Sequence, residues 1–364
     1  MPIYMDRHDV SREVTAENVA QLHQQDLKIQ HNFNCRGLTY WFDDERKTAF
    51  CLIEAPDKNN VVAMHNNAHG EVPHSVIEVD ATIVESFLGR IEDPKKSQNT
   101  ELNIINDPAF RTIMVCNFNI PFSHKKKLNH SDLFKEYRDN LIHLSNQNNG
   151  RIVKQDYNQF LISFKSVTVC IDCALQIFNA YNFSSDSPLK YKIGINAGVP
   201  VTEKETLFEE CIKLADRMCN VSKANIINSN EVKELYASEN QNATLNDTSI
   251  IFLYKSDEYF IESFFDYLEA HWRNTNLKIE DFCMQLGYSK SRLYRTTKDL
   301  FGKSPNNLLR DYRLDQSLKL LRQKPANISE VAFETGFSSP SYFTKCFHKK
   351  YGVSPTEYTK SQKL

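Results

Sequence analysis

The stretch ISEVAFETGFSSPSYFTKCFHKKYGVSP at residues 328–355 repeats the layout of IEDFCMQLGYSKSRLYRTTKDLFGKSP at residues 279–305. In each copy a short apolar segment leads to Leu-Gly-Tyr or Thr-Gly-Phe, then serines, an aromatic and basic segment, and Gly-x-Ser-Pro. Gly287 and Gly336 permit the positive φ of a sharp turn, and Ser289 and Ser338 are predicted to cap the following helices. Each copy therefore predicts a helix-turn-helix, whose second helix enters the major groove of DNA.

The segment between the two copies, NNLLRDYRLDQSLKLLRQ at residues 306–323, places apolar residues at helical spacing and predicts one rigid connecting helix. In the second helix of each copy, Leu293, Leu300, Phe343 and Phe347 are predicted to face the core. The outward residues are the candidates for contacts with bases and phosphates: Ser289, Lys290, Ser291, Arg292, Arg295, Ser338, Ser339, Ser341, Tyr342, Thr344 and Lys345.

The distribution of charge agrees with a polyanionic partner for this part of the chain. The whole sequence of 364 residues has a net charge of -2, but residues 273–364 hold 17 Lys and Arg against 8 Asp and Glu. The rest keeps 27 of the 44 basic and 38 of the 46 acidic residues. A helical bundle with solvated basic faces is the alternative interpretation, and it does not explain the ordered repeat.

This carboxy-terminal region resembles the DNA-binding domain of AraC-type transcription regulators, which carry two helix-turn-helix units on a linking helix. The resemblance covers about 100 residues and rests on GYSKSRLYR, FGKSPNNLLRDYRL and ISEVAFETGFSSPSYFTKCFHKKYGVSPTEY. It implies that both recognition helices read adjacent major grooves of double-stranded DNA. It also implies paired sites and a homodimer, in which the tether between subunits adds avidity.

Residues 1–82 predict a small α/β unit. Strand and helix patterns alternate in the order βαββαβ, which is that of the ferredoxin-like split motif. Six of the eleven histidines lie here. His65 and His69 share one helical face, and the other candidate metal ligands are His8, His74, Cys51 and Glu54. Imidazole with thiolate or carboxylate suits nickel, zinc or copper. Surface histidine pairs without metal, and Cys51 as a core residue, remain the alternatives.

The order MPIYMDRHDV, LTYWFDDERKTAFCLIEAPDK, HNNAHGEVPHSVIEVD resembles small bacterial nickel-binding proteins with a ferredoxin-like fold, often dimeric. The resemblance implies nickel or another divalent transition metal as a ligand, without saying which side chains hold it.

Residues 108–254 predict a second α/β unit. IMVCNFNI, NNGRIVKQDYNQFLISF, ALQIFNAY, LKYKIGINAGVPV and LFEECIKLADRMCNVSKANIINS resemble the class III nucleotide cyclase domain. In that family two aspartates hold two divalent ions, and here Asn117 and Asn158 match their positions. A neutral amide does not replace that charge. Lys213 matches the family's transition-state Asn, and Arg217 its Arg partner. Cys170 and Cys173, inside an apolar helix, are predicted to be core residues.

The predicted fold is therefore multidomain, with two ferredoxin-like α/β units at 1–82 and 108–254 and an all-α double helix-turn-helix domain at 259–364. We expect a non-enzymatic, cytoplasmic transcription regulator that senses a metal ion or small molecule. The alternative is a residual nucleotide cyclase or phosphotransferase that carries a regulatory DNA-binding module. No apolar run approaches the ~20 residues that span a bilayer, and nine unpatterned cysteines favour reduced thiols.

Overall fold

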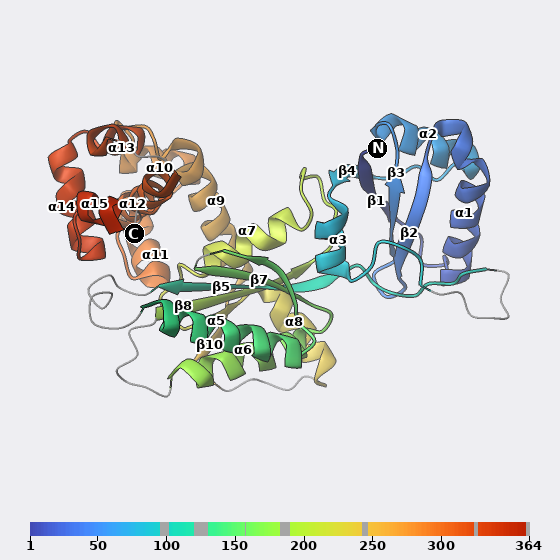
Figure 1. Ribbon diagram of the computed structural model, residues 1–364, viewed down its shortest axis with the longest axis horizontal. Helices are drawn as coiled ribbons and strands as arrows, with labels where there is room; N and C mark the ends of the chain where they lie inside the picture. The colour runs from blue at the N-terminus through green and yellow to red at the C-terminus, as the bar shows by residue number, and fades with distance from the viewer. Residues whose placement is uncertain are drawn as a thin grey trace.

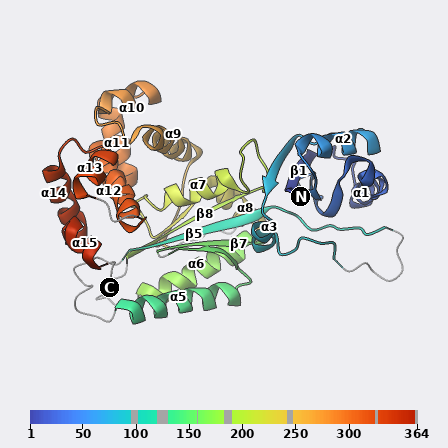
Figure 2. The ribbon, with the colours of Figure 1, turned by 45° about the horizontal axis from the view of Figure 1, so that its top comes forward.

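The computed structural model describes residues 1–94, 102–119, 130–156, 158–182, 190–241, 247–323 and 327–361. Two α/β sheets are followed by a helical region, so the coarse form of the predicted fold is confirmed. The two ends of the chain lie at opposite ends of the molecule, and the larger sheet lies between them (Figures 1 and 2). Within the described ranges no helix combines the length and apolar character needed to cross a bilayer.

The first unit is a four-stranded antiparallel sheet in the order β2-β3-β1-β4, covered on one face by two helices. Its elements are β1 (Ile3–Asp9), α1 (Ala16–Ile29), the short 3-10 helix η1 (Gln30–Phe33), β2 (Arg36–Asp43), β3 (Thr48–Glu54), α2 (Lys58–Ala68) and β4 (Ser75–Val79). Side chains alternate across β1, so Tyr4 packs under the two helices and Met5 packs on the opposite face.

The second unit is a six-stranded sheet in the order β10-β9-β8-β5-β7-β6. Its elements are β5 (Arg111–Asn119), α5 (His130–Gln147), β6 (Arg151–Gln155), β7 (Gln159–Phe164), α6 (Val167–Asn182), β8 (Lys190–Gly198), α7 (Glu209–Met218), β9 (Ile226–Asn228), α8 (Asn230–Glu239) and β10 (Ile250–Phe252). Helices α5 and α6 cover one face of this sheet, and α7 lies on the other (Figure 2). As predicted, Cys170 and Cys173 are core residues, because both are fully buried under the sheet.

The third unit contains only helices: α9 (Lys255–His271), α10 (Ile279–Leu286), α11 (Lys290–Phe301), α12 (Pro305–Gln323), α13 (Ile328–Glu334), α14 (Pro340–Tyr351) and α15 (Pro355–Ser361). Helix α12 is continuous between the two repeats, as its sequence pattern predicts. Gly287 and Gly336 adopt φ values of +66° and +77°, so both turns have the conformation that the repeat implied.

A helix that the sequence pattern did not indicate joins the first two units. Helix α3 (Ala81–Leu88) directly follows β4, and its last carbonyls are bound by the buried guanidinium of Arg111 at the start of β5. Arg111 donates to the carbonyl oxygens of Phe87 (3.2 Å), Leu88 (3.2 Å), Pro108 (2.6 Å) and Phe110 (2.8 Å). Burial lowers the pKa of Arg111 to about 10, and the group keeps its charge at neutral pH. The polar sequence EDPKKSQNTELN at residues 92–103, which is typical of a linker, lies partly outside the described residues.

One apolar cluster extends through all three units. It begins on the face of the first sheet with Met5, Trp41 and Phe50, continues through α3 and α7, and reaches Leu309 on α12. The three units therefore share one core, which fixes their mutual orientation.

Candidate nucleic-acid interface and metal centre

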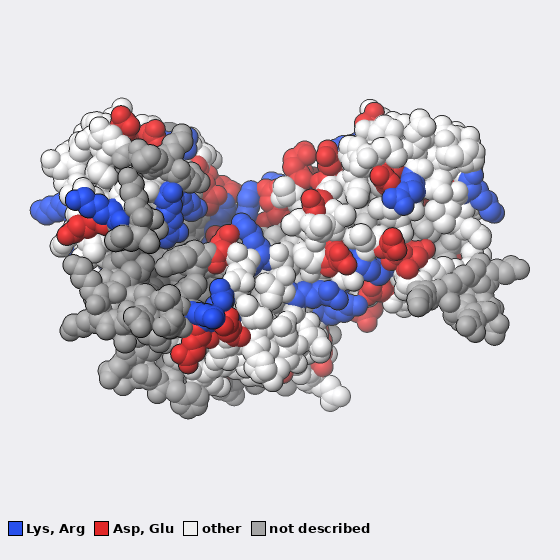
Figure 3. Space-filling model, viewed as in Figure 1, with Lys and Arg blue, Asp and Glu red and all other residues white. Residues whose placement is uncertain are grey.

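The two predicted recognition helices are α11 and α14, and each buries one apolar face. Leu293, Leu300, Phe343 and Phe347 are fully buried, as predicted, and anchor the helices against α12 and the preceding helices. This packing leaves the opposite faces open to a partner. The Lys and Arg side chains of this unit are visible at one end of the molecule, mixed with carboxylates (Figure 3).

On α11 every candidate contact residue is exposed: Ser289, Lys290, Ser291, Arg292 and Arg295. The guanidinium of Arg292 lies 4.2 Å from the centre of the Tyr288 ring, and Lys290 pairs with Glu280 at 2.8 Å. Ser289 caps the helix, because its hydroxyl accepts a hydrogen bond from the backbone N–H of Arg292. An arginine that stacks on a ring keeps its donors free for the edge of a guanine base.

On α14 the candidates Ser338, Ser341, Tyr342 and Lys345 are exposed, whereas Ser339 and Thr344 are half-buried. The prediction that Ser338 caps this helix is wrong. The cap is Ser339, whose hydroxyl accepts from the backbone N–H of Tyr342 at 3.3 Å. The reason is Pro340, which has no N–H and a fixed φ suited to the first helical position, so the residue before it becomes the cap.

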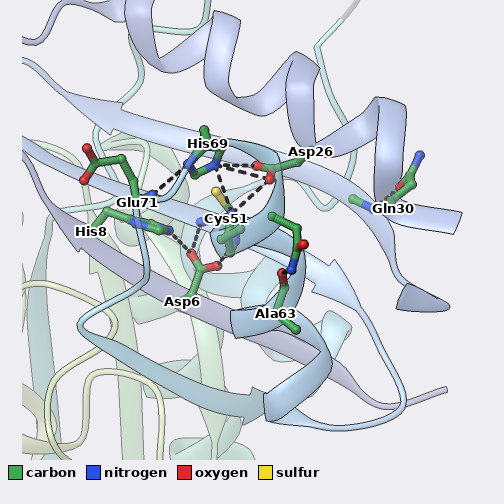
Figure 4. Close-up of polar contacts among 11 residues, drawn as sticks. Asp6, His8, Asp26, Gln30, Cys51, Ala63, His69 and Glu71 are labelled. Atoms are coloured by element: carbon green, nitrogen blue, oxygen red, sulfur yellow. Dashed lines mark hydrogen bonds and ion pairs between the residues drawn. The ribbon is translucent and has the colours of Figure 1, made fainter. Parts of the chain in front are cut away.

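The histidine cluster of the first unit lies between its sheet and its two helices. The ligand atoms of Asp6, His8, Cys51 and His65 lie within 4.8 Å of one another, and those of Asp26, His65 and His69 form a second group. Figure 4 shows the labelled side chains of this set, Asp6 and His8 on β1, Cys51 on β3, Asp26 on α1 and His69 directly after α2, gathered at one place. Asp6 and His8 share one face of β1 because strand side chains alternate.

His65 lies between two carboxylates. Its Nε2 atom is 2.8 Å from Asp6 Oδ2, and its Nδ1 atom is 3.1 Å from Asp26 Oδ1. Burial disfavours the charged imidazole, but the hydrogen bonds that its ring nitrogens donate to Asp26 and Asp6 outweigh this effect and raise the pKa of His65 to about 10. A metal ion would have to displace this proton, because only the neutral ring binds a metal.

One observation favours an ion at this place. His8 Nε2 is buried and has no hydrogen-bond partner among the described residues, while Asp6 Oδ1 lies 3.5 Å away. Burial and the nearby Asp6 carboxylate raise the pKa of the Cys51 thiol well above its ordinary value, so an ion bound to Cys51 would have to displace the thiol proton. A cation would satisfy the imidazole and balance two buried acids, and oxygen, nitrogen and sulfur donors together suit a divalent transition metal.

The structure brings four of the six predicted ligands into these groups, namely His8, Cys51, His65 and His69. His74 lies on the same cavity of about 200 Å³, but its Nδ1 atom accepts from the backbone N–H of Asp9 at 3.1 Å. Glu54 lies outside both groups and pairs with Arg36 at 2.7 Å. It is three residues from Cys51 on one strand, and the alternation of strand side chains turns the two to opposite faces.

Two carboxylates of the cluster were absent from the sequence prediction. Asp6 has the same strand parity as His8, and this spacing would have indicated it. Asp26 lies three residues after His23 on α1, and both are buried on the face that also contains Val19 and Ala20. His23 and Asp26 follow the spacing of the apolar face of α1, and this position of two polar residues could have indicated that they are buried at a site.

The second unit has a cavity of about 700 Å³ against the third unit, and it is lined by Asn117, Asn158, Asp216, Arg217 and residues of α12. Asn117 donates to Asp216 Oδ1 at 3.0 Å, and Gln159 donates to both side chains.

The other two residues matched to the cyclase family are engaged elsewhere. Arg217 is buried and pairs with Asp266 (2.6 Å) and Glu269 (2.7 Å) on α9. Lys213 is exposed and pairs with Glu209 at 2.6 Å. Arg217 therefore binds the third unit with its charged group.

Comparisons with known proteins match two separate parts of the chain. A family described as a helix-turn-helix domain matches residues 282–361, and one described as nickel responsive protein SCO4226-like matches residues 4–79. The probable transcription factor PqrA of Proteus vulgaris is 35% identical over 86 residues, which are 24% of this chain and 70% of PqrA.

Two further similarities each cover less than a third of the chain. Histidine kinase P4 of Formosa agariphila is 32% identical over 102 residues, and these cover 28% of this chain but only 7% of the kinase. The crystal structure of SCO4226 from Streptomyces coelicolor is 30% identical, with a TM-score of 0.20, over 21% of this chain and 94% of that one.

Proposed function

Because the chain belongs to the family of AraC-type transcription regulators, we propose that it binds double-stranded DNA in a sequence-specific way and regulates transcription in the cytoplasm. The observation that carries this proposal is the pair of helices α11 and α14, joined by α12, each with an apolar face buried and a polar face exposed. Two such helices on one rigid connection match successive turns of a major groove.

Selection of bound duplexes from a random pool tests this proposal with the full chain. We expect a site with two conserved blocks, and loss of affinity with rising salt as phosphate contacts are screened. Equal binding to all duplexes at moderate ionic strength would refute it.

Arg292→Ala tests base recognition. We expect relaxed preference at one base pair, equivalent to about 1–3 kcal/mol of discrimination. Lys298→Ala is the matched control, since Lys298 is an exposed cation on the same helix outside the candidate set. Unchanged preference in Arg292→Ala would assign Arg292 to the phosphate backbone instead.

We propose that Asp6, His8, Cys51 and His65 bind nickel or another divalent transition metal, with Asp26 and His69 beside them. The ion would supply positive charge that links β1, β3 and α2. The support is the buried His8 nitrogen, which has no hydrogen-bond partner among the described residues, and the two buried carboxylates, together with the match to the nickel-responsive family.

Thermal unfolding with Ni²⁺ tests the metal site. Saturation at 100 times the dissociation constant should add about 2.7 kcal/mol to the free energy of unfolding of this unit. Asp6→Asn should abolish the gain, whereas Glu54→Gln, on the opposite face, should keep it. No change in melting at a large excess of Ni²⁺, Zn²⁺ and Cu²⁺ would contradict the proposal.

We further propose that both sheets are ferredoxin-like and that the second unit is a cyclase-like scaffold without catalysis. The strand orders β2-β3-β1-β4 and β8-β5-β7-β6 support the fold, and the amides at Asn117 and Asn158 support the lack of activity. Incubation with ATP or GTP and Mn²⁺ should yield no cyclic nucleotide. A cyclic product would favour the alternative, a residual cyclase that carries a DNA-binding module.

Two further proposals concern the oligomeric state of the protein and the boundaries of its domains. We propose a homodimer on paired sites, which sedimentation of the protein–DNA complex would report. We also propose domain boundaries at 1–82, 108–254 and 259–364, and limited proteolysis checks them. Cleavage inside any of these ranges before cleavage between them would count against the boundaries.

A further inference from the structure

One segment of the second unit, residues 199–223, contacts both of the other units. It consists of the loop after β8, helix α7, and the turn before β9. At its start, Arg7 Nη1 donates to the carbonyl oxygen of Val201 (3.3 Å), and Ser75 Oγ donates to that of Thr202 (2.8 Å). Arg7 and Ser75 are paired across β1 and β4, so they hold two successive carbonyls from one place on the sheet.

Both of these residues adjoin histidines of the metal cavity. Arg7 directly precedes His8, and Ser75 directly follows His74. The backbone N–H of His74 donates to the Arg7 carbonyl oxygen at 2.8 Å, and that of Asp9 donates to His74 Nδ1 at 3.1 Å. Neighbouring strand residues point to opposite faces, so Arg7 faces the second unit from the same strand that carries His8.

The far end of the segment contacts the first recognition helix. The backbone N–H of Ser222 donates to the carbonyl oxygen of Leu300 at 2.8 Å, and the Ser222 hydroxyl donates to the same oxygen at 3.2 Å. Lys223 pairs with Asp299 at 2.7 Å. Leu300 and Asp299 lie in the last turn of α11, where carbonyl groups have no partner within the helix. The second unit therefore caps this recognition helix and sets its orientation.

The middle of the segment is tightly packed against the sheet. Helix α7 lies so close to β8 that a Cβ atom at Gly194 would collide with the carbonyl oxygen of Ala215. Ala215 and Met218 are fully buried beneath the helix. Near its end, Arg217 makes its two ion pairs to α9, the first helix of the third unit. Tight packing of this kind moves as a unit and transmits small displacements.

We propose that residues 199–223 couple occupancy of the metal site to the orientation of α11, and so to DNA affinity. This inference rests on the proposed metal and DNA sites, and it adds the route between them. Figure 1 shows why a route is needed, because the first and third units stand apart on either side of α7. Coupling of this kind is reciprocal: bound DNA changes the affinity for the ion by the same factor as the ion changes the affinity for DNA.

The test measures both affinities with the full chain and Ni²⁺ as the probe. The dissociation constant for a selected duplex is measured with saturating Ni²⁺ and with chelator, and that for Ni²⁺ with and without duplex. We expect the two ratios to agree and to differ from unity by about fivefold or more. Binding of both ligands with ratios within twofold of unity would overturn the inference and leave the two sites standing.

Variants at the two ends then locate the route. Arg7→Met combined with Ser75→Ala removes the contacts to Val201 and Thr202 without altering a candidate ligand. Arg217→Met removes the ion pairs to α9, far from the metal site. In each of these two variants, the ratio of the dissociation constants for DNA with and without Ni²⁺ should fall below about twofold, while both ligands still bind.

Matched controls keep the ratio of the natural protein. Arg12→Met removes an exposed cation of the first unit, between β1 and α1, and Lys213→Met removes one on α7 whose pairing with Glu209 stays within the helix. If Arg217→Met folds and retains the full ratio, α7 does not carry the coupling and the route is wrong. A chain that binds no metal overturns the metal proposal and this inference together, and the titration alone distinguishes that case.

Discussion

Gly336→Ala distinguishes the role of backbone conformation from that of packing, because the chain carries its own control. Gly287 holds the equivalent place in the first repeat, and its φ of +66° is close to the +77° of Gly336. A Cβ atom at Gly287 would have no heavy atom within 4 Å. At Gly336 it would lie 2.6 Å from the Trp272 carbonyl oxygen and 2.8 Å from Arg313 Nε.

The two substitutions should therefore differ in cost. Both force alanine into the left-handed region, which costs about 1–2 kcal/mol. Only Gly336→Ala also displaces Arg313, whose guanidinium donates to the carbonyl oxygens of Trp272 and Asn274, both at 2.7 Å. Loss of one charge-assisted hydrogen bond and relief of the overlap add about 2–4 kcal/mol.

Denaturant unfolding followed by tryptophan fluorescence measures the difference. The chain has two tryptophans, so a Trp41→Phe background leaves Trp272, adjacent to the altered turn, as the reporter. Gly336→Ala should lower the free energy of unfolding of the third unit by at least ~2 kcal/mol more than Gly287→Ala. Equal losses, within ~0.5 kcal/mol, would show that the contacts of the turn with Trp272 and Arg313 contribute no stability, and would refute the expected difference.

Three further changes test other parts of the fold. Ser339→Ala should destabilise α14 by ~1 kcal/mol in the same assay, while Ser338→Ala should have no effect; the reverse order would restore Ser338 as the cap. Arg111→Lys should cost ~2 kcal/mol or more in thermal unfolding, because an ammonium group cannot serve four carbonyls; an unchanged melting temperature would contradict this. Glu239 accepts four hydrogen bonds from residues 166–168; burial opposes its charge, but these bonds hold its pKa below the ordinary value. Its stabilisation is therefore present above the ordinary pKa of glutamate and is lost as pH falls through the lowered value, so Glu239→Gln should flatten the acid limb of a stability–pH curve; an unchanged limb would exclude this role.

The repeated units were accessible to sequence reasoning because every device in them is local. The glycine turns, the Ser289 cap and the i, i+4 pair Phe343 and Phe347 act within a few residues of one another. The one local error, at Ser338, came from overlooking Pro340 in the next position but one.

The metal centre was accessible only in part, because its members meet through tertiary packing. The i, i+4 spacing of His65 and His69 identifies them as a candidate pair on one helical face. Asp6 instead lies in an alternating strand, where a carboxylate usually indicates a solvent-facing position, and Asp26 lies on a different helix. Hydrophobic periodicity predicts the strand and the helix, but it does not predict that β1 packs against α1. Neither Asp6 nor Asp26 was therefore identified as a neighbour of His65. Strand parity would, however, have excluded Glu54 once Cys51 was chosen.

The interfaces between units left no local signal at all. Arg217 matched a catalytic position by its place in a resemblance, yet in the structure its charge binds α9. Contacts such as Ser222 with Leu300 join residues 78 positions apart through a backbone N–H, which any residue but proline supplies. Only the arrangement of whole elements reveals them.

The apolar cluster that begins at Trp41 and ends at Leu309 limits how this architecture can be rearranged. The first sheet packs the apolar face that carries Trp41 and Phe50 against the neighbouring units. If another domain replaced the first unit before α3, it would have to supply apolar side chains similar in size and shape to Trp41, Phe50 and Ile77. Without them, Phe87 and Phe208 would be exposed to solvent. The shared core therefore limits the replacement of one unit by an unrelated domain during evolution. We expect substitutions at the core positions of the three units to be correlated.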